Sequence, residues 1–258
     1  MREVLVIVLD GISPSITLSL SELFDDIKWF KRRYRWRVIH INQPPTTSSV
    51  LMTMFTGLRY DEHKIWWFNS IDYNELCNRF KFVWDEAEER GLKVIVSPLP
   101  ITWKPIHKNF KIIGKLKTWE LIFPDKGKIF ETISELHKNM VINIKSNWNL
   151  FISYYPIPDK LYHVTSYGIT EWEHYYNMIK AYALSFRYAR DLINKSNPKR
   201  WLIVGDHGYL CPSRFIRGFE NLRRTLHTPE TIFISNIHPP VSIKDVYYWI
   251  RRWLCFVK

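Results

Sequence analysis

The most informative segment for the fold is Trp201-Leu202-Ile203-Val204-Gly205-Asp206-His207-Gly208. Its first four residues are all apolar, a pattern that predicts a strand buried on both faces. Asp206 and His207 follow this strand, and both are residue types that bind metals. In open α/β sheets, ligands bind outside the carboxyl ends of the strands, so this pair is well placed to hold a metal ion. Taken alone, the pair is equally consistent with a turn cap and an ordinary loop histidine.

Two other predicted strands end in the same way. Residues 3–9 are nearly all β-branched or Leu and run into Asp10-Gly11. Residues 149–155 form a further apolar run, which leads into a loop containing Asp159 and His163. The carboxyl ends of parallel strands meet at one edge of a sheet. We therefore expect one cluster of carboxylate and imidazole groups at this edge: Asp10, Asp159, His163, Asp206, His207 and His227.

A cluster of this composition predicts bound cations. Carboxylates held together without a partner repel one another, and Zn²⁺ or Mn²⁺ would neutralise them. The side chains divide into two sites, each with three protein ligands and an open position for a substrate oxygen. A pair of metals about 4 Å apart can hold the attacking and leaving oxygens of a phosphoryl transfer.

A hydroxyl-rich turn, Pro44-Pro45-Thr46-Thr47-Ser48-Ser49, precedes a predicted helix at 50–55 that Thr56-Gly57 would close. The free N–H groups of a helix N-terminus, next to hydroxyl groups, suit an anion or a nucleophile that attacks one. The alternative is that one of these hydroxyls is only the N-cap.

The remaining chain alternates between helix and strand patterns. Helices are predicted at 16–34, 74–90, 127–144, 170–196 and 243–255, and further strands at 36–41, 92–97 and 231–234. Residues 98–126 show no clear period, so we expect an irregular insertion over the sheet that contacts substrate. The alternation predicts an α/β fold with three layers, in which helices cover both faces of a mostly parallel central sheet. We expect one domain over residues 1–258.

Composition restricts the class of protein. The chain has 258 residues, 46% hydrophobic residues and a formal net charge of +12, which favours anionic partners. No apolar run approaches the roughly 20 residues of a membrane span, and no signal peptide is recognisable, so we expect a cytoplasmic protein. The three cysteines form neither a zinc knuckle nor a disulfide framework. Any metal must therefore be held by His and Asp.

These motifs, in this order, resemble the alkaline phosphatase superfamily, and within it most closely the nucleotide pyrophosphatase/phosphodiesterase branch. Thr47 lies ten residues before Gly57, where that family places its nucleophile, and His63 resembles its structural histidine. The resemblance covers roughly residues 3 to 235. Its metal motifs are Asp10-Gly11, Asp159-x3-His163, Asp206-His207-Gly208 and His227.

The resemblance implies a role for each residue. Asp159, His163 and His227 would hold one divalent metal ion. Asp10, Asp206 and His207 would hold the other, which also binds the Thr47 hydroxyl. Zn²⁺ is the first expectation and Mn²⁺ the second. Thr47 would attack phosphorus to form a phospho-threonine that water hydrolyses, while the Ser48 N–H and the Asn69 side chain hold a non-bridging oxygen. Asn69 sits one residue later than in the family.

Several functions stay open at this stage. The resemblance favours a phosphodiesterase or nucleotide pyrophosphatase acting on an anionic phosphoester such as a nucleotide. A phosphomonoesterase is the nearest alternative. A sulfatase of this superfamily would carry Cys or Ser followed by Pro-Ser-Arg, a pattern that Thr47-Ser48-Ser49-Val50 does not match. From another class, a non-catalytic protein that keeps the fold could bind nucleic acid through its charge and Trp66-Trp67. We expect these tryptophans to belong to the core or a pocket wall.

Overall fold

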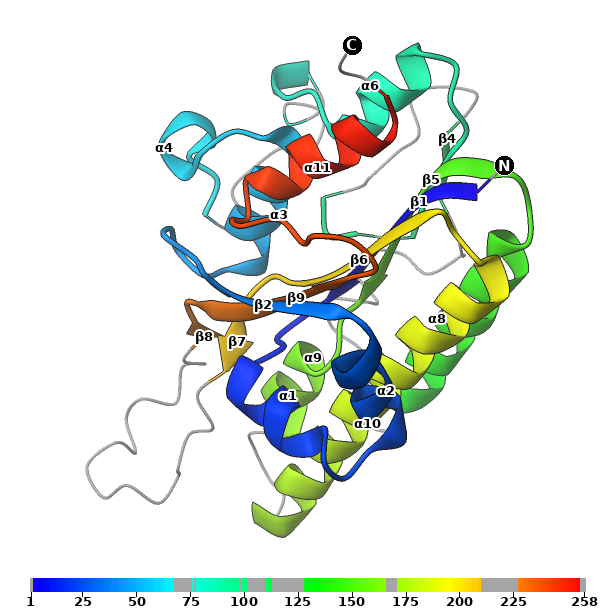
Figure 1. Cartoon of the computed structure of the whole chain (residues 1–258). Coiled ribbons are helices and arrows are strands. Elements are labelled where there is room, and N and C mark those ends of the chain that lie inside the picture. The colour runs from blue at the N-terminus through cyan, green and yellow to red at the C-terminus, as the bar shows by residue number, and fades with distance from the viewer. Residues whose placement is uncertain are drawn as a thin grey trace.

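The structure is a computed structural model of the chain, shown in Figure 1. It describes residues 2–66, 76, 78–97, 99–101, 110–112, 128–165, 171–209 and 227–255. None of the helices within these ranges is both long enough and apolar enough to cross a lipid bilayer.

A seven-stranded sheet with the order β2-β9-β6-β1-β5-β3-β4 forms the middle layer. All its pairings are parallel except the two that β9 makes, with β6 and with β2. The prediction of a mostly parallel sheet is therefore confirmed. The strands are β1 (Arg2–Leu9), β2 (Arg35–His40), β3 (Val94–Val96), β4 (Phe110–Ile112), β5 (Trp148–Tyr155), β6 (Arg200–Gly205) and β9 (Glu230–Ser235). A separate two-stranded sheet pairs β7 (Gly208–Tyr209) with β8 (His227–Thr228).

Helices cover both faces of the large sheet (Figure 1). One face carries α1 (Pro14–Leu20), α2 (Asp25–Arg33), α8 (Ile129–Ile144), α9 (Asp159–Thr165) and α10 (Glu171–Ser196). The other face carries α3 (Thr47–Thr56), α6 (Val83–Glu89) and α11 (Asp245–Trp253), with the short α4 (Tyr60–His63) beside α3. The expected three-layer α/β architecture is confirmed.

The central strand β1 explains why its sequence is apolar without interruption. Leu5, Ile7 and Leu9 pack with α8 and α10, while Val4, Val6 and Val8 pack with α3, α6 and α11. All six side chains are fully buried. Burial of each such side chain stabilises the fold by about 1.5–3 kcal/mol. A strand covered on both faces needs apolar residues at consecutive positions, because successive side chains point to opposite faces.

Four predicted elements differ in the structure. Residues 16–34 are not one helix, because α1 ends at Leu20 and α2 begins at Asp25. The loop expected after residue 155 contains α9, which begins at Asp159. Within the segment predicted to be irregular, Phe110–Ile112 forms the edge strand β4, parallel to β3. Of the predicted helix at 74–90, α6 supplies the end, and residues 80–82 before it are not helical.

The topology gathers several loops at one edge of the sheet. β5, β1 and β6 are adjacent and parallel, so the residues after them leave the sheet together. β9 runs in the opposite direction, and therefore the chain that enters β9 lies at this same edge. His227, three residues before β9, reaches the ends of β1 and β6 for this reason.

Candidate active site

Three aspartates form the floor of the site where β1, β5 and β6 end. Asp10, Asp159 and Asp206 are each at most 1% exposed. Backbone groups hold these loops together: the Asp159 N–H donates to the Asp10 carbonyl oxygen (3.0 Å), and the Gly11 N–H donates to Asp206 Oδ1 (3.1 Å). The carboxylates are therefore fixed by hydrogen bonds between loops that are far apart in the sequence.

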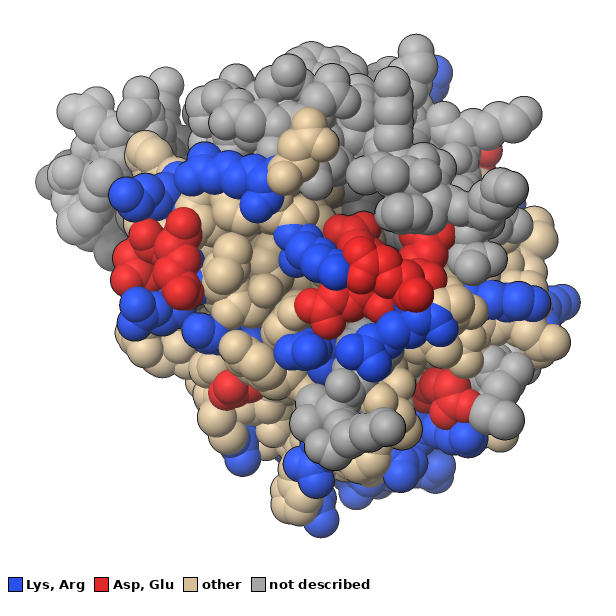
Figure 2. All heavy atoms as spheres, turned by 90° about the horizontal axis from the view of Figure 1, so that it is seen from above, with Lys and Arg blue, Asp and Glu red and all other residues tan. Residues whose placement is uncertain are grey.

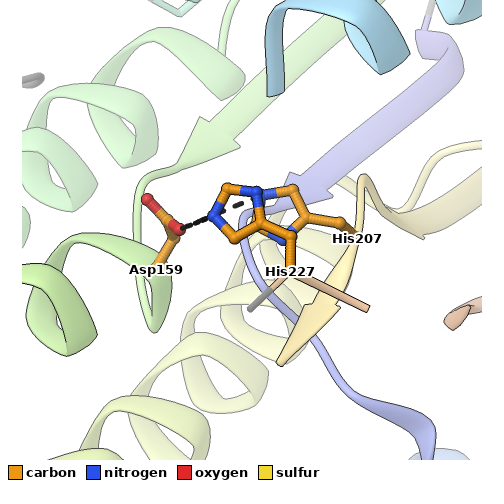
Figure 3. Close-up of side chains that lie close together, drawn as sticks. All are labelled: Asp159, His207 and His227. Atoms are coloured by element: carbon orange, nitrogen blue, oxygen red, sulfur yellow. Dashed lines mark ion pairs between the residues drawn. The ribbon is translucent and has the colours of Figure 1, made fainter. Parts of the chain in front are cut away.

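Three histidines complete the cluster. His207 Nε2 lies 3.2 Å from Asp10 Oδ1 and 3.6 Å from Asp206 Oδ2. His227 Nε2 and His163 Nε2 lie 3.4 Å and 3.3 Å from the same oxygen, Asp159 Oδ1. The rings of His207 and His227 stack with centroids 3.8 Å apart, and the His227 ring points toward Asp159 (Figure 3). The structure thus brings all six predicted ligand residues together.

The candidate ligand atoms form two groups, each close enough together to hold a metal ion. One group is Asp10, Asp206 and His207, the set that the sequence predicts for one ion. The other is Asp159, His207 and His227, in which His207 stands where the sequence predicts His163. His207 has a single Nε2 to offer, and His163 also lies within 3.3 Å of Asp159. The predicted division, with His163 on the Asp159 side, gives each ion three ligands of its own.

The donor set fits cations. Asp159 Oδ1 and Asp206 Oδ2 are buried oxygens that accept no hydrogen bond from the described part of the chain. The Nδ1–H groups of His207 and His227 donate to the carbonyl oxygens of Gly208 (3.3 Å) and Pro45 (2.8 Å). These bonds turn Nε2 of each ring toward the carboxylates, which is how histidine ligands of metals are usually held.

Charge interactions shift the pKa values of the cluster in different directions. Burial and the neighbouring charge of Asp10 raise the pKa of Asp206 well above its ordinary value. Burial alone would lower the pKa of His207, but the hydrogen bond and charge of Asp10 outweigh it and raise this pKa. Burial would raise the pKa of Asp159, but the charges of Lys160 and His163 outweigh it and hold this pKa well below the usual range. Without cations, the cluster compensates its negative charge with protons and Lys160.

Two further polar groups in this site were not identified from the sequence. The Tyr154 hydroxyl donates to Asp10 Oδ2, and Lys160 Nζ lies 3.1 Å from Asp159 Oδ2. Only their positions in the sequence could have indicated them: Tyr154 lies in the strand before Asp159, and Lys160 directly follows Asp159. Neither residue type is specific enough to be selected on that basis.

Thr47 faces the same carboxylates from the other side of the sheet edge. It is the first residue of α3, and its hydroxyl Oγ1 lies 3.4 Å from Asp10 Oδ1 and 3.3 Å from His207 Nε2. Thr46 is the N-cap and accepts the Ser49 N–H (3.4 Å). The N-cap and the hydroxyl that faces the cluster are therefore two different residues. Thr46 is the cap, and Thr47 supplies the hydroxyl at the cluster.

Two other predicted features have different outcomes. Asn69 lies outside the described residues, and so does Trp67. Trp66 is 61% exposed, so it is not a core residue, and its expected place in a pocket wall stays a prediction. His137 has a structural role: it is buried and bonds to the Tyr155 hydroxyl (2.7 Å) and to Asp191 (3.0 Å).

Comparison with known proteins identifies the fold. No protein-family model and no curated protein sequence matches the chain. Among solved structures, murine ectonucleotide pyrophosphatase/phosphodiesterase 5, solved as an inactive variant in complex with AMP, superposes with a TM-score of 0.62 at 12% identity, over 99% of this chain and 95% of that chain.

Two other solved structures share the architecture. Phosphonoacetate hydrolase from Sinorhizobium meliloti 1021, in complex with phosphonoacetate, gives a TM-score of 0.54 at 15% identity, over 80% of this chain and 56% of that chain. A 2-O GAG sulfatase gives 0.60 at 9% identity, over 98% and 70%. All three structures belong to the alkaline phosphatase superfamily. The chain therefore has the alkaline phosphatase-like fold.

Proposed function

We propose that this chain is a two-metal phosphoesterase that hydrolyses phosphodiester or pyrophosphate bonds in nucleotide-like substrates through a phospho-threonine at Thr47. One observation carries the proposal: the Thr47 hydroxyl lies at a helix N-terminus within 3.4 Å of both Asp10 and His207. A nucleophile beside metal ligands, at the positive end of a helix dipole, suits attack on a phosphorus that carries anionic oxygens.

The ligand residues determine what the site can bind. Asp10, Asp206 and His207 would hold one divalent cation, and Asp159, His163 and His227 the other. When bound, the two cations would neutralise the phosphoryl oxygens and lower the pKa of the attacking hydroxyl. Zn²⁺ suits a set of imidazole and carboxylate ligands, and Mn²⁺ is the alternative.

The chain's own groups account for the remaining steps. Thr47 Oγ1 would lose its proton and form a bond to phosphorus while the bond from phosphorus to the ester oxygen opposite it breaks, and the leaving oxygen would take up a proton from solvent. The backbone N–H of Ser48, in the first turn of α3, has no intrahelical partner and would donate to a non-bridging oxygen. Asn69 would be a second donor, as the family resemblance implies. Water then cleaves the phospho-threonine and restores the Thr47 hydroxyl.

Two observations bear on the substrate. The superposed murine phosphodiesterase structure contains AMP, which supports a nucleotide-like ligand. On α4, α6 and α11, at the top of Figure 1, basic side chains pair with acidic ones, as in Arg59–Asp61 (3.0 Å), Lys81–Glu89 and Arg251–Glu86 (3.0 Å). Figure 2 shows this mixture of charges on that face. A surface of mixed charge is a poor platform for nucleic acid, so this face does not favour the non-catalytic alternative.

The test is metal content together with hydrolysis of a p-nitrophenyl phosphodiester and p-nitrophenyl phosphate. We expect about two equivalents of metal and faster cleavage of the diester. Thr47→Ala should lower kcat by at least about 10³-fold while leaving the fold and the metal content intact. Ser48→Ala is the matched control, because it removes a neighbouring hydroxyl and keeps the backbone N–H.

Each result has a distinct meaning. Loss of activity in Ser48→Ala with full activity in Thr47→Ala would move the nucleophile by one residue. Preference for the monoester would keep the mechanism and make the chain a phosphomonoesterase. A protein that contains no metal, has no activity and binds nucleic acid would refute the proposal that this chain is an enzyme. The cytoplasmic location and the single domain over residues 1–258 stay predictions.

A further inference from the structure

The ammonium group of Lys160 forms an ion pair with Asp159, one of the proposed metal ligands. Its Nζ lies 3.1 Å from Asp159 Oδ2, its side chain is 17% exposed, and that of Asp159 is 1% exposed. Lys160 follows Asp159 directly in the first turn of α9. One oxygen of Asp159 is thus bound to an ammonium group, and only Oδ1 faces His163 and His227.

This contact makes the two halves of the cluster unequal. The two-carboxylate site consists of Asp10, Asp206 and His207, and the one-carboxylate site consists of Asp159, His163 and His227. With its carboxylates ionised, the first site carries two negative charges. Each site also holds one buried carboxylate oxygen that accepts no hydrogen bond from the described residues, Asp206 Oδ2 in the first and Asp159 Oδ1 in the second. In the second site the single carboxylate is already neutralised by Lys160.

We propose that Lys160 weakens cation binding at the one-carboxylate site, so that the two-carboxylate site fills first and the second ion binds only at a higher metal concentration. Lys160 would then set the metal concentration at which the enzyme becomes fully active. The inference rests on the proposed two-metal function and adds to it a residue that regulates loading. Lys160 is a positioning residue in this role, because it acts through Asp159.

Two physical effects of Lys160 both weaken cation binding at the one-carboxylate site. The ammonium group repels a divalent cation bound to the same carboxylate, and little solvent separates the two charges. It also occupies Oδ2, so Asp159 can offer a single oxygen unless the ion pair breaks. In the metal-free protein Lys160 has the opposite effect, because it compensates a buried carboxylate that would otherwise be costly. Removing the charge should therefore tighten metal binding and destabilise the metal-free fold.

The experiment is a titration of the metal-free protein with chelator-buffered Zn²⁺, followed by calorimetry and by thermal unfolding. For the wild type we expect two binding steps whose dissociation constants differ at least tenfold. Lys160→Met should tighten the second step at least tenfold and change the first by less than threefold. It should also lower the Tm of the metal-free protein. Lys160→Arg, which keeps the charge, should leave both steps separated.

Lys199→Met is the matched control for net charge. Lys199 forms an ion pair with Glu3 (2.9 Å) at a side-chain exposure of 57%, remote from the cluster. If Lys199→Met tightens the second step as much as Lys160→Met does, the effect is general and the inference is wrong. An unchanged second step in Lys160→Met would also refute it.

The failures of the two proposals are distinguishable. A wild type that binds two ions with equal affinity refutes the role of Lys160 and leaves the two-metal enzyme standing. A wild type that binds no ion refutes both. If Lys160→Met does not fold without metal, Lys160→Gln, which can still donate to Asp159, is purified with Zn²⁺ and titrated with chelator. The same tenfold tightening of the second ion is expected, and its absence counts against the inference.

Discussion

At the scale of single residues, Gly11 shows how closely the site is built. Its φ of +79° lies in the left-handed region that favours glycine. A Cβ at this position would lie 2.5 Å from Tyr209 Cε2 and 3.1 Å from the Asp159 Cα. Only a residue without a side chain lets the loop after β1 turn here while Tyr209 and Asp159 approach the backbone. Glycine is thus required after Asp10 both by the positive φ and by the lack of room for a side chain.

Gly11→Ala should therefore destabilise the protein and disturb the metal site together. Gly91 is the matched control, because its φ is +74° and a Cβ there would meet nothing within 4 Å. Gly91→Ala carries only the backbone cost, about 1–2 kcal/mol. Gly11→Ala should lose at least about 1–3 kcal/mol more through overpacking, and should bind Zn²⁺ more weakly. Urea unfolding and a Zn²⁺ titration of both variants test this, and equal losses would show that the contacts at Gly11 do not matter.

The sequence predicted which aspartates and histidines cluster at the sheet edge, but not the groups that support them. Asp10, Asp206 and His207 could be identified because each residue type has its own metal chemistry and each follows an apolar strand. Tyr154 reaches Asp10 across 144 positions of sequence, and His227 is oriented by the Pro45 carbonyl across 182. Such contacts depend on which loops meet, and residue type alone does not determine that.

At the scale of elements, helix α3 is anchored at its first turn so that Thr47 stays in place. Besides capping the helix, Thr46 donates from Oγ1 to the Trp66 carbonyl oxygen (2.8 Å). A second set of bonds runs behind it: His63 Nε2 to Thr53 Oγ1 (2.9 Å), Thr53 Oγ1 to Gln43 Oε1 (2.9 Å) and Gln43 Nε2 to Ser49 Oγ (3.0 Å). These bonds connect α3 to the segments before and after it.

Removing the cap should weaken the protein and loosen the nucleophile. Thr46→Ala loses both hydroxyl contacts, which should cost about 0.5–2 kcal/mol in the free energy of unfolding. Thr46→Ser keeps the hydroxyl and should retain most of this stability. Because Thr47 would be less well positioned, kcat of the alanine variant should fall while the metal content stays at the wild-type value. Urea unfolding and steady-state kinetics of the two variants check this. Equal stability of Ala and Ser would show that the cap contributes little.

His63 should make the protein sensitive to acid. The Ile65 N–H donates to its Nδ1 (3.0 Å), so the ring is the neutral form. Burial lowers the pKa of His63 from 6.5 to about 4. Between these two pH values the unfolded state binds more protons than the folded state. The free energy of unfolding should therefore fall as the pH drops from 6.5 to about 4, by at most about 3 kcal/mol from this group.

The comparison with His63→Gln isolates this effect. Glutamine does not titrate, so urea unfolding of the metal-free variant should decline less steeply across this range than that of the metal-free wild type. The carboxylates contribute to both proteins alike and cancel in the difference. Parallel pH curves for the two proteins would assign the acid sensitivity to other groups.

The elements themselves were predicted as far as their patterns are local. The strands that carry Asp10 and Asp206 are long apolar runs and lie where expected. The break between α1 and α2 has no Pro or Gly to announce it. It depends on Ser21, whose hydroxyl bonds back to the Leu18 carbonyl oxygen (2.6 Å). Strand β4 is three residues long and exists because β3 offers it an edge, which is a tertiary effect.

At the scale of the whole molecule, the site lies where the two cores meet the sheet edge. The helices on one face hold α9 and its Asp159, and those on the other face hold α3 and its Thr47. Thr47 and Asp159 therefore come from opposite sides of the sheet, and the carboxylates of Asp10 and Asp206, which follow β1 and β6, lie between them. Cations bound there would join the two layers, so that metal binding and global stability are linked.

Removal of metal should therefore lower the stability of the entire protein. A ligand that binds only the folded state stabilises it by about 2.7 kcal/mol at 100 times its dissociation constant. Chelation should lower the Tm, and added Zn²⁺ should restore it in a concentration-dependent way. Asp206→Asn removes a ligand charge and should reduce this response. Asp26→Asn removes a partly exposed carboxylate that pairs with Arg190 (3.0 Å) instead, and should keep the response. Calorimetric scans of the three proteins with and without Zn²⁺ measure the shift in Tm. A wild-type Tm that changes with neither chelator nor Zn²⁺ would mean that these carboxylates and histidines hold no metal.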